Sequence, residues 1–263
     1  FSIMEVSDEV RRFQLLLAYD GRPFDGWQSQ ASGNTIQDEV LKALVAICPE
    51  IKTVQGSGRH DAGVSASGQV AHFDVPAHRR MGAEEWRKAL NTKQPASIRA
   101  LSAEEKNLEF HARFSAEEKE YRYRIISAEV LPPLLAGLAW HRRGFAGTEE
   151  LSRVLRLFEG THDFRAFSAK RHDGKDETRD TRRTISKANL LLTGDEQWYI
   201  RVRGNGFLYN MVRFLVGTAV YCIEGRITEA EIRELLEAPE NSKAPYCAPP
   251  DGLSLEAVHY PLG

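Results

Sequence analysis

Cysteine is scarce in this sequence, which has three cysteines among 263 residues. Cys48, Cys222 and Cys247 lie far apart, and no Cys-x-x-Cys pair occurs. Disulfide-stapled domains and zinc fingers need several closely spaced cysteines, so both classes are excluded. The scarcity fits a protein of the reducing cytoplasm, and a chain of this length buries a sizeable core without disulfides.

Net charge and long apolar runs are also lacking. Lys and Arg number 35 against 37 for Asp and Glu, which gives a net charge of -2 and little overall attraction for nucleic acid. RNA binding would need basic residues gathered on one face. The N-terminus has no basic-then-apolar signal pattern, and no apolar run could span a bilayer, so we expect no membrane contact.

Several nucleotide and metal motifs are missing as well. There is no P-loop, and Gly56-Ser57-Gly58 continues to Asp61 where a dinucleotide fingerprint requires glycine. The His-x-Glu and Pro-Cys-x-x-Cys signature of zinc nucleobase deaminases is absent. His60, His72 and His78 show no ligand spacing, so we expect no metal site.

The most distinctive stretch that is present runs from Gly56 to Asp74. Four glycines accompany a single loop carboxylate, Asp61, with Arg59 two residues before it. Glycine permits positive φ and close approach of another molecule, so this loop could hold one acid against a ligand. It could equally be a tight hairpin whose Asp satisfies turn amides.

The residues of this stretch carry a family resemblance. The run Gly-Arg-His-Asp-Ala-Gly-Val at 58–64, followed by Gly-Gln-Val-Ala-His-Phe at 68–73, resembles the active-site signature of the TruA-type tRNA pseudouridine synthases. That family has an Arg-Thr-Asp-Ala-Gly-Val-His core with an essential Asp, which the resemblance places at Asp61. His60 replaces the usual Thr, and Ser65 replaces the usual His.

A second matching segment runs from Tyr19 to Gln30 and contains, after Tyr19, the aromatic residues Phe24 and Trp27 and also Gln28. This segment could form a flat surface that contacts RNA, or it could be a loop whose aromatic rings pack on the core. The family has a similar Tyr-Asp-Gly and Gly-Trp-Gln element here, so the resemblance extends to Gln28 as a substrate contact.

The second half opens with Phe-His-Ala-Arg-Phe-Ser-Ala at 110–116, which contains Arg113. In the strand that follows, Tyr121 and Tyr123 alternate with arginines at the period of a strand. The tyrosine face either looks into a cleft, where Tyr121 could stack on a base, or belongs to the core. The family has the same run leading to an active-site tyrosine, which implies that Tyr121 lies in the pocket.

Residues 163–187 form the most basic region, with eight Lys/Arg against five Asp/Glu. Basic loops with aromatic residues suit phosphates and unstacked bases, although a solvated loop has the same composition. The family shows similar Gly-Thr-His-Asp-Phe and Arg-x-Ile elements, which favours RNA contact by Phe164 and Arg165.

An apolar helix is predicted from about 208 to 223, and it contains Arg213 within a stripe of small and polar residues. A buried guanidinium needs a partner, and Asp61 is the candidate. The alternative is an arginine that snorkels from a partly exposed flank. The family's Met-Val-Arg-x-x-Val-Gly pattern matches residues 211–217, and its Arg lines the active site.

We predict an α+β fold of two ferredoxin-like (RRM-like) lobes, 1–105 and 106–263, whose antiparallel sheets meet at a central active-site cleft. The first lobe is expected to follow the order strand 13–19, helix 35–47, strands 53–55 and 69–75, helix 84–90 and strand 98–101. The second is expected to contain strand 121–125, helix 149–158, a hairpin of 185–192 and 198–202, helices 208–223 and 228–236, and strand 253–257.

The resemblance implies an isomerase that converts uridine to pseudouridine at positions 38 to 40 of the tRNA anticodon stem-loop. The target base must be flipped out to be reached. Asp61 would be the nucleophile, Tyr121 would stack on the base and help move the C5 proton, and Arg213 would keep Asp61 ionised with Arg59. Arg59 could instead fill the space that the base vacates. The expected substrate contacts are Arg59, His60, Tyr121, Gln28, Arg113, Phe164 and Arg165.

This chemistry requires no cofactor and no metal, and the family acts as a homodimer on tRNA. Two alternatives remain at this stage. The first is a non-catalytic RNA-binding module, which explains the Arg/aromatic strand but not a lone Asp in a glycine loop. The second is a metal-assisted hydrolase built on His60, Asp61 and His72.

Overall fold

The computed structural model describes residues 9–146, 149–170, 180–192 and 196–261. The chain forms two compact units: unit 1 comprises Phe1–Ala116 with Tyr260–Gly263, and unit 2 comprises Glu117–His259. The last strand before this division ends at Lys106. The domain boundary that we expect at 105/106 stays a proposal. Of the predicted basic segment 163–187, residues 171–179 lie outside the described residues.

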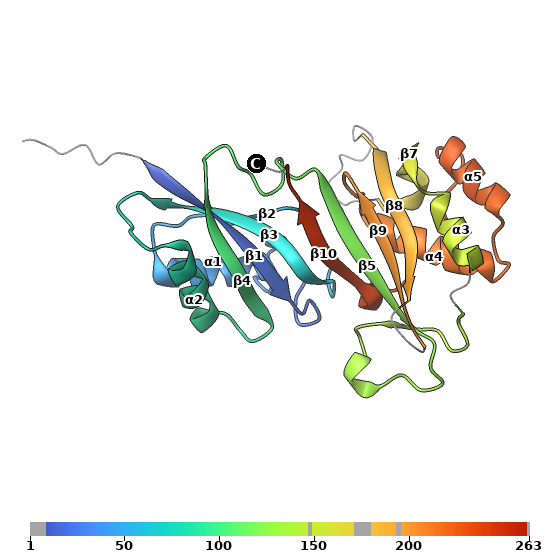
Figure 1. Ribbon diagram of the computed structural model, residues 1–263, viewed down its shortest axis with the longest axis horizontal. Helices are drawn as coiled ribbons and strands as arrows, with labels where there is room; N and C mark the ends of the chain where they lie inside the picture. The colour runs from blue at the N-terminus through green and yellow to red at the C-terminus, as the bar shows by residue number, and fades with distance from the viewer. Residues whose placement is uncertain (1–8, 147–148, 171–179, 193–195, 262–263) are drawn as a thin grey trace, which may run out of the picture. The chain divides into compact units, whose positions relative to one another are not determined.

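Unit 1 is an antiparallel sheet with two helices (Figure 1). The sheet order is β4-β1-β3, and the short β2 pairs with β3. In chain order the elements are β1 (Val10–Tyr19), α1 (Ile36–Ile47), β2 (Gln55–Gly56), β3 (Ser65–Pro76), α2 (Ala83–Lys93) and β4 (Ile98–Lys106). This is the strand-helix-strand-strand-helix-strand order predicted for a ferredoxin-like module.

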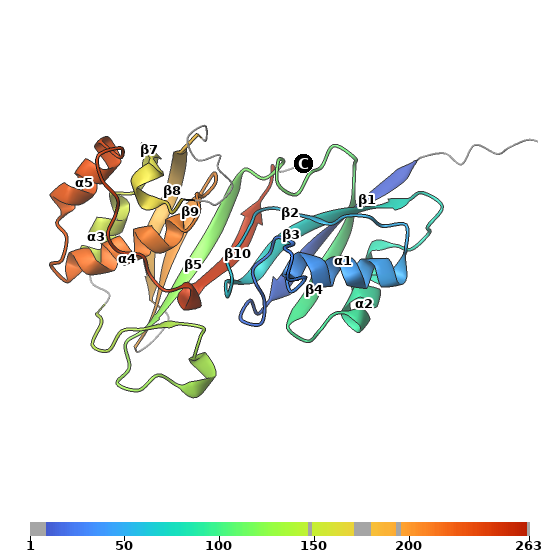
Figure 2. The ribbon, with the colours of Figure 1, turned by 180° about the vertical axis from the view of Figure 1, so that it is seen from behind.

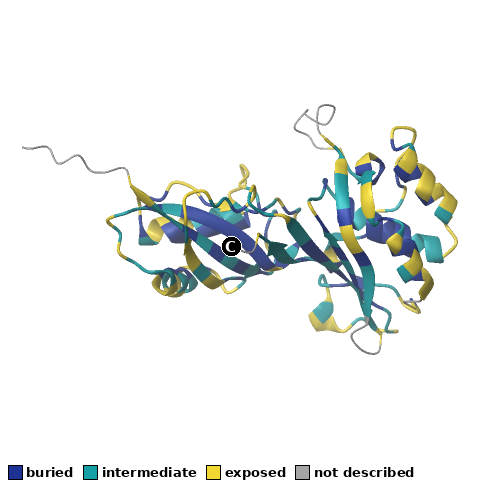
Figure 3. Ribbon diagram, turned by 45° about the horizontal axis from the view of Figure 1, so that its top comes forward, coloured by how far each residue is buried: buried dark blue, intermediate teal, exposed yellow. Residues whose placement is uncertain are grey.

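The core of unit 1 follows from strand alternation. Along β1, Phe13, Leu15 and Leu17 are fully buried, while the residues between them are half-buried. Trp86 of α2 packs on Phe13 at 6.1 Å between ring centroids, and β3 is buried along most of its length (Figure 3). Helix α1, in front of the sheet in Figure 2, begins where the Thr35 side chain accepts from the Asp38 amide.

Within unit 2 the strands lie in the order β10-β5-β9-β8-β7 and pair antiparallel, and the short β6 runs parallel to β5. The strands of unit 2 are β5 (Glu118–Ile126), β6 (Trp140–His141), β7 (Gly160–Asp163), β8 (Arg182–Leu192), β9 (Gln197–Gly204) and β10 (Leu253–His259). The helices are α3 (Glu149–Arg156), α4 (Met211–Ile223) and α5 (Glu229–Glu237), with short 3₁₀ turns η1 (Pro133–Leu135), η2 (Phe164–Phe167) and η3 (Pro250–Gly252).

The three helices of unit 2 gather on one side of its sheet (Figures 1 and 2). Residues 215–220 of α4 are all buried, which confirms the prediction of an apolar, interior helix. Helix α4 begins at Met211 rather than near residue 208, because Asn210 adopts a left-handed conformation with φ of 58°. Helix α5 exposes its outer surface in Figure 3.

The structure confirms the α+β class with predominantly antiparallel sheets. Each helix and strand that the sequence predicts is present among the described residues, and most strands extend several residues further than the pattern indicated. No helix in the described part of the chain has both the length and the apolar character needed to cross a membrane.

Candidate active site

The loop that carries Asp61 connects β2 to β3, and we call residues 57–64 the Asp61 loop. Its base is closed by hydrogen bonds: the Ser57 amide donates to the Val70 carbonyl (2.7 Å), and the Ser57 hydroxyl donates to Gln69 Oε1 (2.6 Å). The Val64 amide donates to the Asp61 carbonyl (3.2 Å), and Gly63 has φ of +80°. These bonds make a tight turn that leaves Asp61 half-buried.

A second loop, residues 20–28, packs against the Asp61 loop, and we call it the bracing loop. The Trp27 amide donates to the His60 carbonyl (3.2 Å). Gly26 has φ of +96°, and a Cβ there would lie 2.4 Å from the same carbonyl oxygen. A Cβ on Gly56 would lie 2.4 Å from the Trp27 ring, which is 2% exposed. The two loops therefore approach each other closely only because glycines line the contact.

The two positions that depart from the family motif both stabilise this arrangement. The hydroxyl of Tyr19 lies 2.6 Å from His60 Nδ1, and both side chains are buried. The Ser65 hydroxyl accepts from the Gly21 amide at 3.0 Å. His60 is thus tied to the end of β1, and Ser65 to the start of the bracing loop.

Of the other expected substrate contacts in unit 1, Arg59 and Arg113 are exposed and Gln28 is half-buried. The Gln28 side chain donates to Gln37 Oε1 (2.8 Å), which connects the bracing loop to α1. Within unit 1, the structure brings Arg59, His60 and Asp61 together with the bracing loop that carries Gln28.

Tyr121 lies in β5 of unit 2 and is 7% exposed. Its ring meets Phe207 edge to face, with 5.0 Å between centroids. Tyr123, on the same face, is fully buried and donates to the Pro249 carbonyl (2.7 Å). Tyr123 is therefore a core residue, and its burial raises the pKa of its phenol. Tyr121 is also buried but keeps some accessible surface.

Arg213 projects from the first turn of α4 and is half-buried. Its Nε donates to the Ala248 carbonyl (2.7 Å), and Nη1 donates to Asn210 Oδ1 (3.0 Å). The Ala248 amide in turn donates to the Arg213 carbonyl (3.0 Å). The guanidinium is therefore oriented by its own unit, and its pairing with Asp61 stays a prediction.

The segment after β7 places its two expected RNA contacts very differently. Phe164 is fully buried and packs near Phe167 at 6.2 Å between ring centroids. Arg165 is exposed, and its amide donates to Asp163 Oδ1 (3.0 Å). A ligand could reach Arg165 directly, whereas contact with Phe164 would require that ring to leave the core.

His72 of β3 is 3% exposed, and its Nδ1 accepts from the Ala112 amide (3.1 Å). Burial first, and the nearby Arg12 guanidinium second, lower the pKa of His72 from 6.5 to about 4. Among the described residues, no three His, Cys, Asp or Glu side chains are grouped so that they could hold a metal ion.

This shift predicts a loss of stability in acid. Between pH 6.5 and 4 the unfolded chain binds a proton at His72 that the folded chain excludes, so stability falls as the pH falls. Protonation of His72 alone can lower the free energy of unfolding by at most about 3 kcal/mol. Urea unfolding at pH 7 and pH 4.5 measures the loss, and His72→Gln, which does not titrate, is expected to lose less. Equal losses in both proteins would contradict the assignment.

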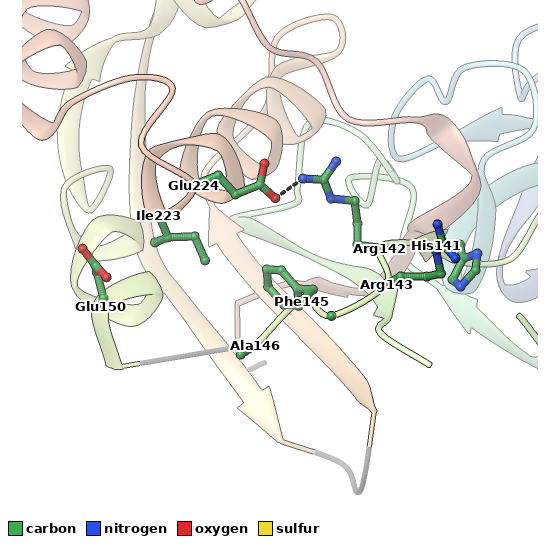
Figure 4. A pocket seen from close by; sticks show the side chains of 9 residues that line it. His141, Arg142, Arg143, Phe145, Ala146, Glu150, Ile223 and Glu224 are labelled. Carbon is green, nitrogen blue, oxygen red and sulfur yellow. Dashed lines mark hydrogen bonds and ion pairs between the residues drawn. The ribbon is translucent and has the colours of Figure 1, made fainter. Parts of the chain in front are cut away.

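One pocket of unit 2 is lined by none of the expected site residues. It measures about 560 Å³ and lies beside the end of α4, with Phe145 projecting into it (Figure 4). Arg142 forms an ion pair with Glu224, and its guanidinium lies over the Trp140 and Tyr221 rings at 4.8 and 5.1 Å. Its cation is thus already paired and stacked, as expected for a structural contact.

Comparison with known proteins identifies the class. A family profile described as tRNA pseudouridine synthase matches residues 16–115 and 154–261. The matched residues include the Asp61 loop and α4. The chain therefore belongs to the tRNA pseudouridine synthase family, whose members are isomerases.

Relatives narrow the class to the TruA type. The chain is 46% identical over 255 residues to tRNA pseudouridine synthase A of Akkermansia muciniphila, covering 96% of each chain. It is 40% identical over 251 residues to the protein of that name from Brevibacillus brevis, covering 95% of this chain and 100% of the relative. The solved Cbf5-Nop10-Gar1 complex aligns with 14% identity and a TM-score of 0.36, over 79% of this chain and 44% of that one. The resemblance drawn from the sequence and the isomerase class are confirmed.

Sequence reasoning did not identify every residue that shapes the Asp61 loop. Tyr19, Gly26 and Trp27 were placed in a matching segment, but their contacts with His60 and Gly56 were not foreseen. The available signal was the Gly-Trp pair itself, since a glycine beside a large ring often marks close backbone approach.

Proposed function

We propose that this protein converts uridine to pseudouridine in the anticodon stem-loop of tRNA, at positions 38 to 40, with Asp61 as the nucleophile. The observation that carries the proposal is family membership across both units, combined with a single carboxylate on a tightly braced, glycine-rich hairpin. A carboxylate held in a fixed position loses little entropy when it meets its target.

The reaction rearranges one nucleotide without adding or removing atoms. The bond between N1 and C1′ breaks, the uracil turns, and C5 joins C1′; the C5 proton leaves to solvent and N1 gains a proton. Because the target base is stacked in a stem or loop, it must first be flipped out. No electron is transferred, so the balanced reaction needs no redox cofactor.

In this proposal three side chains act on the flipped uridine. Asp61 attacks the nucleotide, Tyr121 stacks on the detached uracil and assists transfer of the C5 proton, and Arg213 supplies positive charge that keeps Asp61 ionised. The edge-to-face contact with Phe207 and the bond from Arg213 to the Ala248 carbonyl fix these two side chains before substrate arrives.

Substrate contacts follow from charge and accessibility. Arg59, Arg113 and Arg165 are exposed cations suited to phosphates. His60 belongs to the Asp61 loop, and Gln28 to the bracing loop that packs against it. Phe164 supports Arg165 from the core. We further propose that the protein acts as a homodimer in the cytoplasm, with the tRNA body held by surfaces beyond the reacting nucleotide.

The role of Arg213 can be tested through pH. In Arg213→Gln, the acid limb of the kcat/KM profile is expected to move to higher pH by about one unit or more, because a carboxylate without a nearby cation takes up its proton more readily. Arg226→Gln removes an exposed arginine after the same helix and is the matched control. An unshifted profile in Arg213→Gln would refute the electrostatic role.

The proposed reaction itself is tested with tRNA transcript carrying tritium at uridine C5. Bond formation at C5 expels the tritium into water, so the wild-type protein is expected to release it with multiple turnovers. If the protein binds the tRNA but releases no tritium, the proposed reaction is refuted and the non-catalytic RNA-binding module is favoured.

A further inference from the structure

Phe114 stands out among the apolar side chains of the described residues. Its side chain is 76% exposed, and it is the only aromatic ring among the exposed large hydrophobic residues of the part that the structure describes. A ring left in water contributes nothing to the core, and a single exposed ring is too small for a stable protein interface. Its exposure leaves a flat apolar face open to a ligand that binds one ring at a time.

The loop that carries Phe114 is rigidly held. Both the Arg113 and the Phe114 amides donate to His111 Nδ1, at 3.1 and 3.3 Å. His111 and Ser115 exchange two further bonds, from the His111 amide to Ser115 Oγ and from the Ser115 amide to the His111 carbonyl, each 2.9 Å. These four hydrogen bonds hold the backbone from which the ring projects.

The loop that carries Phe114 is also bonded to the core of unit 1 and to β2, the strand before the Asp61 loop. The fully buried Ala112 donates its amide to His72 Nδ1 (3.1 Å) and accepts from the Tyr260 hydroxyl (2.6 Å). His111 Nε2 lies 2.9 Å from Gln55 Oε1, and Gln55 belongs to β2, which leads directly into the Asp61 loop. Phe114 is thus part of the scaffold that presents Asp61.

One cation and one neutral ring lie next to the Phe114 side chain. The Arg113 guanidinium lies 5.6 Å from the Phe114 centroid, and the His111 ring is 4.3 Å away on a tilted plane. Arg113 is exposed. A nucleotide offers both features that this pair can bind, a flat base for the ring and a phosphate for the guanidinium.

We propose that Phe114 is a base-stacking residue: its ring carries one unpaired base of the substrate RNA while Arg113 contacts the adjoining phosphate. This inference rests on the proposed function, because it takes RNA as the ligand of unit 1. Phe114 and Arg113 would together hold a nucleotide other than the one that reacts. The inference therefore assigns to Phe114 a role in substrate binding and none in the chemical step.

The test compares binding and turnover for an unmodified tRNA transcript. Phe114→Ala is expected to raise both Kd and KM about 5- to 150-fold, the range for one lost base–aromatic stack, with kcat changed less than about threefold. Phe114→Trp, which keeps a stacking face, is expected to bind within a few-fold of wild type. Leu134→Ala, which removes an 88% exposed apolar side chain from unit 2, is the control and should change nothing.

The salt dependence of tRNA binding distinguishes the contribution of Arg113 from that of Phe114. Arg113→Ala is expected to reduce the slope of log K against log salt by about one, whereas Phe114→Ala weakens binding with the slope unchanged. Unchanged Kd in a folded Phe114→Ala variant, or a change in oligomeric state alone, would overturn the proposal. Because Kd is measured without turnover, a wild-type protein that binds tRNA but makes no pseudouridine refutes the proposed function and leaves the stacking role standing.

Discussion

Asp61→Asn is expected to abolish pseudouridine formation, with turnover reduced on the order of 10⁴-fold or more, while the Kd for tRNA stays within a few-fold of wild type. The amide is nearly isosteric with the carboxylate but is a far poorer nucleophile. Turnover is measured by tritium release from C5-labelled uridine, and binding by filter retention of the same tRNA.

The matched control is Asp25→Asn, which neutralises a half-buried aspartate in the bracing loop beside the Asp61 loop. It is expected to leave turnover within about threefold of wild type, because Asp25 has no part in the proposed chemistry. Full activity in Asp61→Asn would eliminate the nucleophile assignment. Loss of tRNA binding in Asp61→Asn would instead make Asp61 a binding group.

Gly26→Ala is expected to displace the Asp61 loop and remove most activity. A Cβ at Gly26 would lie 2.4 Å from the His60 carbonyl oxygen, a backbone atom that cannot turn away, so the loop itself must shift. Displacement of a nucleophile by about 1 Å costs on the order of 100-fold in rate. The clash adds about 1–3 kcal/mol of destabilisation to the strain of positive φ.

Gly33→Ala separates the clash from the backbone strain. Gly33 also has positive φ, at +66°, but its added Cβ meets nothing within 4 Å. This variant is expected to lose about 1–2 kcal/mol of stability and to keep its activity. Thermal unfolding and tritium release measured on both variants decide the matter: equal activities would mean that the position of the Asp61 loop does not depend on the bracing loop.

Much of the fold could be predicted because local sequence and tertiary structure agree. Ile36, Val40, Leu44 and Ile47 recur at helical spacing after Thr35, a favourable N-cap, and Tyr121 and Tyr123 alternate with arginines as in a strand. Both patterns specify the elements that the structure contains, α1 and β5. The family could be identified because the motif around Asp61 combines glycine positions with particular polar residues. Such a pattern reflects requirements of backbone conformation and chemistry that few sequences meet.

Other features depended on tertiary contacts that no local pattern encodes. Phe164 lies in a basic, polar segment, yet its ring is fully buried. The start of α4 was displaced because Asn210 adopts positive φ, a choice that residue type permits but does not dictate. The Tyr19 to His60 bond joins residues 41 positions apart, so neither side chain alone signalled it.

The most direct test of the central claim is to map pseudouridine, nucleotide by nucleotide, in an unmodified tRNA transcript after treatment with the wild-type protein and with Asp61→Asn. We predict modification confined to uridines at positions 38 to 40 with the wild-type protein, and none with the variant. A transcript that stays unmodified with the wild-type protein, or is modified equally by both, would contradict the account.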